Sequence, residues 1–244
     1  MNVYGLIGFP LSHSFSEKYF NEKFQREGIT NAVFKNFSIK NIDHLPEVLQ
    51  ENNLKGIAVT IPYKKAVIPF LHEASLTVRQ ICACNCIRIE KDKLIGFNTD
   101  VVGFEKSFVK QLRPHHKNAL ILGTGGAAAA VEFVLKKLQI NFRFVSRTRS
   151  IENNIFSYDD LNDEVIKEYT IIINCTPLGT YPKNDTCPAI PYALLTPEHY
   201  LFDLVYNPAK TKFLQLGEQK GAVIQNGYEM LVLQAEENWR IWND

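Results

Sequence analysis

The 244-residue sequence has no excess of either charge: 27 Lys and Arg stand against 26 Asp and Glu, for a net charge of +1. Non-specific binding to nucleic acid or to acidic membranes needs a basic face, so we expect neither partner. The 13 glycines and 11 prolines are too few for a collagen-like or low-complexity chain. With 45% hydrophobic and 22% charged residues, the chain can bury the core of one large domain or two modest ones.

Long hydrophobic runs are also missing. The apolar start is interrupted by Gly5, Gly8 and Pro10, and the first basic residue is Lys18, which argues against a signal peptide. The longest weakly polar run, 119–131, contains three glycines and is shorter than the roughly 18 residues of a membrane span. We therefore expect a cytoplasmic protein with no membrane partner.

Cysteines are few and odd in number: there are five, three of them at Cys82, Cys84 and Cys86. Such close positions do not bridge easily, so we expect no disulfide framework and a reducing compartment. A structural zinc takes four ligands, usually from two Cys-x2-Cys pairs, and neither a second pair nor a nearby histidine completes a set here. The sequence favours small buried side chains over a metal site.

Short apolar runs alternate with amphipathic stretches along the chain. This alternation predicts the α/β class, with parallel sheets covered on both faces. A polar joint at 114–117 divides the series into two α/β domains. Strands are expected at 2–9, 32–39, 56–60, 84–90, 94–97, 119–122, 142–146, 170–174, 200–204 and 222–225, and helices at 16–28, 42–49, 63–72, 100–111, 125–138 and 159–167, after Pro208 and at the end of the chain. The strands at 84–90 and 94–97 should form a hairpin that turns at 91–93, and Pro69 should kink the 63–72 helix or stop it early.

A glycine-rich segment, Leu120–Ala127 (LILGTGGA), joins a predicted strand to an alanine-rich helix. Glycines let the backbone approach a pyrophosphate, whose charge a helix N-terminus favours. The next strand ends in Ser146–Arg149 (SRTR), where an NAD-binding chain usually has an acidic residue. Guanidinium groups bind phosphate, so the pattern favours NADP over NAD. A glycine-tolerant turn beside two solvated arginines is the alternative.

A second set of polar residues lies at strand-to-helix crossings in the first half of the chain: Ser12–Ser16, Thr60–Lys64 and Asn98–Asp100. Open α/β sheets bind ligands at such crossings, and a helix N-terminus suits a carboxylate. Each residue alone is as readily a helix cap or a solvated charge. The combination predicts a binding site for a small polar molecule.

Taken in order, these motifs resemble the shikimate dehydrogenase family over almost the whole chain. The matching segments are Gly8–Pro10, Ser12–Ser16, Ala58–Lys64 (AVTIPYK), Asn85, Gly96–Asp100 (GFNTD), Gly123–Ala127, Ser146–Thr148, Asn174–Gly179 (NCTPLG), Asp203–Pro208 (DLVYNP) and Gly227–Ala235 (GYEMLVLQA). The resemblance implies reversible NADPH-dependent reduction of 3-dehydroshikimate to shikimate in chorismate biosynthesis. It also implies a monomer or homodimer.

The resemblance further implies a substrate-binding domain of residues 1–99 plus 226–244 and a Rossmann-like NADP-binding domain of residues 100–225, with a cleft between them. We expect this cleft to close on the substrate about hinges near Asp100 and Gly227.

Individual roles follow from the same resemblance. It assigns the acid/base pair to Lys64 and Asp100 and the substrate carboxylate to Ser14 and Ser16. The other substrate contacts would come from Thr60, Asn85, Tyr206 and Gln234. The pyrophosphate would lie on Gly123, Thr124, Gly125, Gly126 and Ala127, the 2′-phosphate on Ser146, Arg147 and Thr148, and the nicotinamide between Leu204 and Gly227.

Four positions depart from the letters usual in the family: Ala58 replaces Asn, Cys84 and Cys86 replace Val and Thr, and Pro177 replaces Ser. They concern packing rather than the reaction. Two other functions stay open: a quinate/shikimate dehydrogenase of broader specificity, and a non-catalytic NADP-binding regulator. No acidic residue ends the 142–146 strand to favour NAD, and a regulator needs no Lys64–Asp100 proton shuttle.

Overall fold

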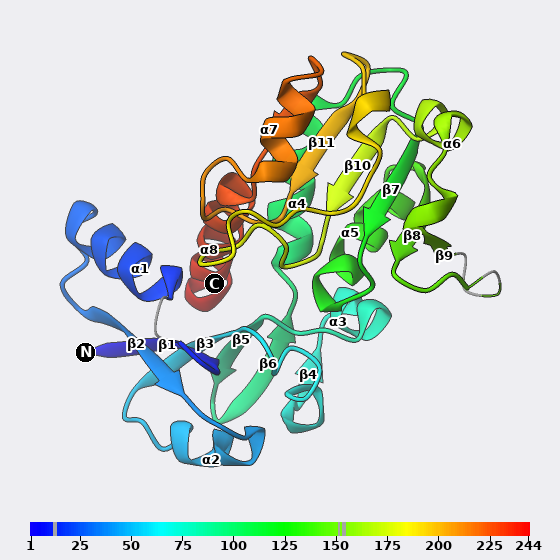
Figure 1. Cartoon of the computed structure of the whole chain (residues 1–244). Helices are drawn as coiled ribbons and strands as arrows, with labels where there is room; N and C mark the ends of the chain where they lie inside the picture. Colours follow the sequence, from blue (N-terminus) through cyan, green and yellow to red (C-terminus); the bar gives the residue numbers. More distant parts are fainter. Residues whose placement is uncertain (12–13, 151, 153–154) are drawn as a thin grey trace. The chain divides into compact units, whose positions relative to one another are not determined.

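The computed structural model describes residues 1–11, 14–150, 152 and 155–244 and divides into two compact units (Figure 1). The first unit comprises Met1–Thr99 and Ala235–Asp244, and the second comprises Asp100–Gln234. Helix α8 (Tyr228–Asn243) contributes to both units. The second boundary between the two units therefore lies inside a helix.

The sheet of the first unit has the strand order β2-β1-β3-β5-β6-β4. Strand β1 runs parallel to β2 and β3, but β5 runs antiparallel to β3 and β6, so the sheet is mixed rather than parallel. The reason is a tight turn: Lys91 and Asp92 both have positive φ, which joins adjacent antiparallel strands without a crossover helix. The strands are β1 (Asn2–Gly8), β2 (Ala32–Ser38), β3 (Leu54–Val59), β4 (Glu73–Ala74), β5 (Cys86–Glu90) and β6 (Lys93–Phe97).

Helices are short in the first unit, except α1 and α8. The elements are α1 (Phe15–Arg26), η1 (Ile42–His44), α2 (Leu45–Val48), η2 (Ile68–Phe70) and α3 (Leu76–Ile81). The helix expected at 63–72 is wrong: turns over 61–67 precede η2. Pro69, expected as a kink or an early stop, lies in η2, where its missing amide hydrogen and its ring obstruct a continuing helix. Helix α3 was not expected. Its start is marked by Ser75, whose hydroxyl accepts a hydrogen bond from the Val78 amide.

Both faces of this sheet are buried. Along β1, Val3 and Ile7 face a cluster that includes Leu45 of α2 and Val78 of α3, whereas Tyr4 and Leu6 face the cluster of α1 and the end of α8. On that second face Trp242 of α8 stacks on Tyr4 with ring centroids 5.2 Å apart. The end of α8 is therefore part of the core of the first unit.

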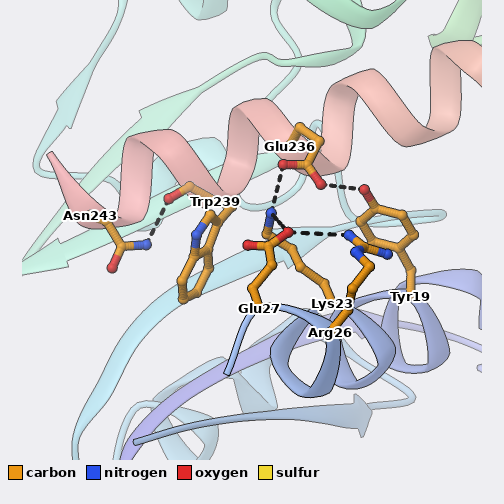
Figure 2. A network of polar contacts seen from close by, with 7 residues as sticks. All are labelled: Tyr19, Lys23, Arg26, Glu27, Glu236, Trp239 and Asn243. Carbon is orange, nitrogen blue, oxygen red and sulfur yellow. Dashed lines mark hydrogen bonds and ion pairs between the residues drawn. The ribbon is translucent and has the colours of Figure 1, made fainter. Parts of the chain in front are cut away.

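A polar network ties α8 to α1 beside this core (Figure 2). The Lys23 ammonium lies 2.9 Å from Glu27 and 2.8 Å from Glu236, and the Tyr19 hydroxyl donates to Glu236. Burial by itself lowers the pKa of Lys23, but the hydrogen bonds to Glu236 and Glu27 outweigh burial, so its pKa is raised. The network fixes α1, which carries Ser16 at its start, against the end of α8.

In the second unit all six strands are parallel, in the order β12-β11-β10-β7-β8-β9. Numbered along the chain, this is the doubly wound order of dinucleotide-binding sheets, with the reversal between β7 and β10. The strands are β7 (Asn118–Leu122), β8 (Asn141–Ser146), β9 (Ile155–Ser157), β10 (Ile171–Asn174), β11 (Tyr200–Asp203) and β12 (Val223–Gln225). This part of the fold confirms the predicted Rossmann-like domain.

Helices cover both faces of the second sheet. One face packs Leu120, Ile172 and Leu201 against Ile166 of α6 and Phe213 of α7. On the other face Phe104 of α4 lies edge-on to Phe202, with ring centroids 5.1 Å apart. The helical elements are α4 (Asp100–Phe108), η3 (Val109–Gln111), α5 (Gly126–Lys137), η4 (Tyr158–Asp160), α6 (Asp163–Glu168), η5 (Tyr192–Leu194) and α7 (Lys212–Glu218).

No helix among the described residues is long and apolar enough to cross a membrane. Their His, Cys, Asp and Glu side chains form no group of three that could hold a metal ion. Cys84 and Cys86 form no disulfide and are fully buried, as the sequence indicated, whereas Cys82 is exposed.

Candidate active site

One edge of the first sheet gathers the segments that carry several of the predicted substrate residues. In the strand register Ile7 pairs with Val59, and Cys86 pairs with both Ala58 and Phe97. The carboxyl ends of β1, β3 and β6 and the amino end of β5 therefore share an edge. The segments that carry Ser14, Thr60, Asn85 and Thr99 all adjoin it.

Ser14 lies at the start of α1, where a serine normally caps the helix, but its side chain makes no capping hydrogen bond. Its hydroxyl oxygen is buried and has no hydrogen-bond partner among the described residues. A buried, unsatisfied polar group costs about 1–3 kcal/mol. The geometry thus favours an external polar partner, and Ser16 lies half-buried in the first helical turn. Ser12 and His13 lie outside the described residues.

The same edge of the sheet also carries Thr60, Lys64 and Asn85. The Thr60 amide donates to the Ile7 carbonyl at 3.0 Å, and the Lys64 carbonyl accepts from the Cys84 amide at 2.7 Å. These bonds hold the segment after β3 beside the start of β5. Thr60 and Lys64 are half-buried, and Asn85 is buried. A hydroxyl, an ammonium and an amide are the groups that recognise a polyhydroxylated substrate.

Asp100 and Gln234 belong to the second unit. Asp100 is the first residue of α4 and is half-buried, while Gln234 is buried on α8 and donates to the Leu231 carbonyl at 2.9 Å. Helices α4 and α8 approach closely, since a Cβ on Gly103 would lie 2.5 Å from the Met230 carbonyl oxygen. Lys64 belongs to the first unit, so its pairing with Asp100 stays a prediction.

The glycine-rich loop follows β7. Gly123 has a φ of +98°, a conformation that favours glycine, and its amide donates to the Val145 carbonyl at 2.8 Å. Gly125 caps α5 without a side chain, and a Cβ added to Gly125 or Gly126 would meet nothing within 4 Å. The first turn of α5 is therefore open at these glycines, and together with Thr124 and Ala127 it stays the predicted pyrophosphate site.

The two arginines of the segment after β8 have different surroundings. The Ser146 hydroxyl accepts from the Thr148 amide at 3.2 Å, which folds the segment into a turn and leaves Arg147 exposed. Arg149 instead pairs with Asp160 at 3.1 Å. Arg147 is thus the better placed guanidinium for a 2′-phosphate.

Leu204, Tyr206 and Gly227 lie together beyond β11. The Gly227 amide donates to the Val205 carbonyl at 3.2 Å, and a Cβ on Gly227 would lie only 2.2 Å from the Leu204 carbonyl oxygen. Only glycine fits this close approach. Tyr206 is half-buried, and burial raises the pKa of its hydroxyl.

A buried polar network joins the ends of β10 and β11; its residues Asn174 and Asp203 begin two of the matching segments, but the sequence assigns them no role. Asp203 accepts hydrogen bonds from the Asn174 side chain at 2.9 Å, from the Val205 amide at 3.0 Å and from the Thr211 hydroxyl. Burial raises the pKa of Asp203 to about 6 against these three hydrogen bonds, which lower it. Its signal in the sequence is a polar residue that ends each of two apolar strands, IIIN and YLFD.

Comparisons with known proteins agree with this geometry. Residues 6–87 match the family model of the shikimate dehydrogenase substrate binding domain. The chain is 33% identical to the shikimate dehydrogenase (NADP(+)) of Desulforamulus reducens, over 98% of this chain and 89% of the relative. It is 35% identical to that of Clostridium beijerinckii, over 100% and 93%.

A solved structure extends the likeness to three dimensions. Shikimate 5-dehydrogenase from Thermus thermophilus, in complex with NADP(H) and shikimate, superposes with a TM-score of 0.86 at 28% identity, covering 99% of this chain and 93% of that one. Sequence and fold therefore agree over nearly the full length, and the chain belongs to the shikimate dehydrogenase family.

Proposed function

We propose that this chain catalyses the reversible, NADPH-dependent reduction of 3-dehydroshikimate to shikimate, a step of chorismate and aromatic amino-acid biosynthesis. The observation that carries the proposal is the buried hydroxyl of Ser14 at the start of α1, which finds no hydrogen-bond partner in the part of the chain that the structure describes. The carboxylate of shikimate would satisfy that hydroxyl and take the favourable electrostatic position at a helix N-terminus. Full-length relatives that carry this activity in their names support it.

Residues of the second unit would hold NADPH, which supplies the hydride. The open first turn of α5, with Gly123, Thr124, Gly125, Gly126 and Ala127, supports pyrophosphate binding there. Exposed Arg147, with Ser146 and Thr148, would bind the adenosine 2′-phosphate. Leu204 and Gly227 would flank the nicotinamide.

Residues at the edge of the first sheet would bind the substrate. Ser14 and Ser16 would hold the carboxylate, while Thr60, Asn85, Tyr206 and Gln234 would contact the rest of the molecule. Lys64 would transfer the proton at the reacting oxygen and stabilise its developing negative charge. Asp100 would accept a hydrogen bond and orient the ammonium, so that the pair titrates as one unit.

The substrate-binding domain (residues 1–99 plus 226–244) and the NADP-binding domain (residues 100–225) would then form a cleft that closes with both ligands bound, excluding water and aligning the hydride donor. Asp100 and Gly227 are our candidates for the hinges. Small-angle scattering should show a smaller radius of gyration with shikimate and NADP⁺ than without. An unchanged radius would contradict closure.

One assay tests the function: oxidation of shikimate and of quinate, each with NADP⁺ and with NAD⁺. We expect turnover of shikimate with NADP⁺ to exceed the other three combinations. Comparable turnover of quinate would make the chain a quinate/shikimate dehydrogenase. NADP binding without any turnover would make it a regulator. We further propose a cytoplasmic monomer or homodimer, which fractionation and sedimentation would test.

A further inference from the structure

Three buried polar side chains of the first unit are joined to one another by hydrogen bonds. Asn85 precedes β5, Thr99 follows β6, and Asn238 lies on α8, with exposed fractions of 3%, 1% and 1%. The Thr99 hydroxyl is 2.7 Å from the Asn238 Oδ1 and 3.0 Å from the Asn85 Nδ2. The Thr99 amide donates to the Asn85 Oδ1 at 2.6 Å. The Asn85 amide group is thus held by Thr99, which is held by Asn238.

The number of available hydrogens fixes the direction of these hydrogen bonds. The Thr99 hydroxyl has a single hydrogen and two acceptors in reach: the Asn238 Oδ1 at 2.7 Å and the Asn85 Oδ1 at 3.2 Å. With the hydrogen on the shorter bond to Asn238, the hydroxyl oxygen can accept from the Asn85 Nδ2. The Asn85 Oδ1 then accepts a hydrogen bond only from the Thr99 amide. All three groups are satisfied in one arrangement, as buried polar groups require.

We propose that Asn238 is a positioning residue that sets the orientation of the Asn85 amide through the Thr99 hydroxyl. The proposal rests on the function above, in which Asn85 contacts the substrate. In the arrangement set by Asn238, one Asn85 Nδ2 hydrogen goes to Thr99 and the other is left to donate to a substrate oxygen. Asn238 itself need not touch the substrate.

Without Asn238, the structure holds a competing arrangement. The Thr99 hydroxyl would turn its hydrogen to the Asn85 Oδ1, already 3.2 Å away, and its oxygen would accept less well from the Nδ2. The Asn85 amide would then lose its fixed orientation. The place of Asn238 also fits a specific role: it lies three residues after Ala235, which is fully buried, on the apolar side of α8, where packing alone calls for a hydrophobic residue.

The experiment compares Asn238→Ala, Thr99→Val and the double variant. Asn243→Ala is the matched control, because Asn243 lies on the same helix but bonds to the Trp239 carbonyl. We expect Asn238→Ala to raise the KM for shikimate about five-fold, the loss of one hydrogen bond, and to leave the KM for NADP⁺ unchanged. In the Thr99→Val background the same substitution should add nothing further, because the path through the hydroxyl is gone. Additive effects would overturn the proposal.

A second readout needs no activity. The side-chain amide signals of Asn85 in the ¹⁵N-labelled protein, assigned through their loss in Asn85→Asp, should shift in Asn238→Ala and stay in place in Asn243→Ala. Unchanged signals in Asn238→Ala would refute the positioning role whatever the enzyme assays give. Shifted signals in a protein that oxidises no shikimate would refute the proposed function and leave the positioning role intact.

If Asn238→Ala does not fold, two substitutions at Thr99 test the proposal instead. Thr99→Ser keeps the hydroxyl and should keep both the Asn85 signals and the KM for shikimate. Thr99→Val removes the hydroxyl and should change both. The same result for Ser and Val would overturn the proposal.

Discussion

The side-chain amide of Asn174 donates a 2.9 Å hydrogen bond to the carboxylate of Asp203, and both side chains are fully buried at the ends of adjacent strands β10 and β11. Asp203 also accepts from Val205 and Thr211. One carboxylate thereby ties the start of the segment after β11, which leads to Tyr206, to the end of β10.

This burial predicts a pH-dependent stability. The pKa of Asp203 rises from 3.8 to about 6 on folding, so the unfolded state releases its proton at lower pH than the folded state. The contribution of Asp203 is therefore greatest below about pH 4 and falls through pH 6, by on the order of 3 kcal/mol. In Asp203→Asn no proton is released. The free energy of unfolding of this variant relative to the unsubstituted protein should increase between pH 4 and pH 6 in urea titrations; a constant difference would contradict the assignment.

Lys64→Ala should lower turnover of shikimate by at least about a hundred-fold, because general acid–base catalysis contributes on this scale. The Kd for shikimate should change much less. The adjacent, exposed Lys65 provides the control, since Lys65→Ala removes the same charge one position away. Steady-state kinetics and calorimetric titration would measure both quantities, and near-normal turnover in Lys64→Ala would remove Lys64 from the mechanism.

Arg147→Ala should raise the KM for NADP⁺ about tenfold or more, because a charge-assisted contact to the 2′-phosphate contributes roughly 1.5–3 kcal/mol. The KM for NAD⁺, which has no 2′-phosphate, should change little. Arg149→Ala should have a smaller effect on either value, since Arg149 pairs with Asp160. Equal losses with both cofactors in Arg147→Ala would show that the residue is structural.

Lys23→Met should destabilise the protein by about 2 kcal/mol, measured by urea unfolding. The Lys23 side chain is only 5% exposed, and its removal takes away the ammonium that lies between the carboxylates of Glu27 and Glu236, leaving Glu27 only the exposed Arg26. Breaking a buried ion pair costs about 3–5 kcal/mol, but both carboxylates are 38% exposed and regain water. Arg26→Ala removes an exposed cation from Glu27 and should change the stability by less than about 0.5 kcal/mol. Equal effects of the two substitutions would contradict the role of the Figure 2 network.

Apolar runs located most strands of the fold, because segments such as IIIN at β10 are buried on both faces. Apolar runs alone do not give strand direction, but the polar turn at 91–93 predicted the hairpin of 84–90 and 94–97, and the antiparallel pairing of β5 with β6 confirms it. At 63–72 the apolar spacing did identify buried residues, since Tyr63 and Val67 are both in the core, but turns rather than a helix bury them.

For the candidate site, the order of the motifs identified the segments that carry the site residues. It did not identify the distant residues that hydrogen-bond to them. Asn85 and Asp100 stand beside strand ends and are visible in the sequence as polar residues after or before apolar runs. Asn238 is 139 residues from Thr99, and no local pattern links the two. Its only signal is a polar residue on the apolar stripe of α8, which by itself has many explanations.

Helix α8 also has a consequence for synthesis on the ribosome. Residues Met1–Thr99 are made first, yet the cluster of Tyr4 and Phe34 is completed by Trp242, close to the end of the chain. All of Asp100–Gln234 must therefore be translated before the first unit can bury that face. Until then its aromatic surface is exposed to chaperones and to other nascent chains, while the second unit can already assemble its parallel sheet.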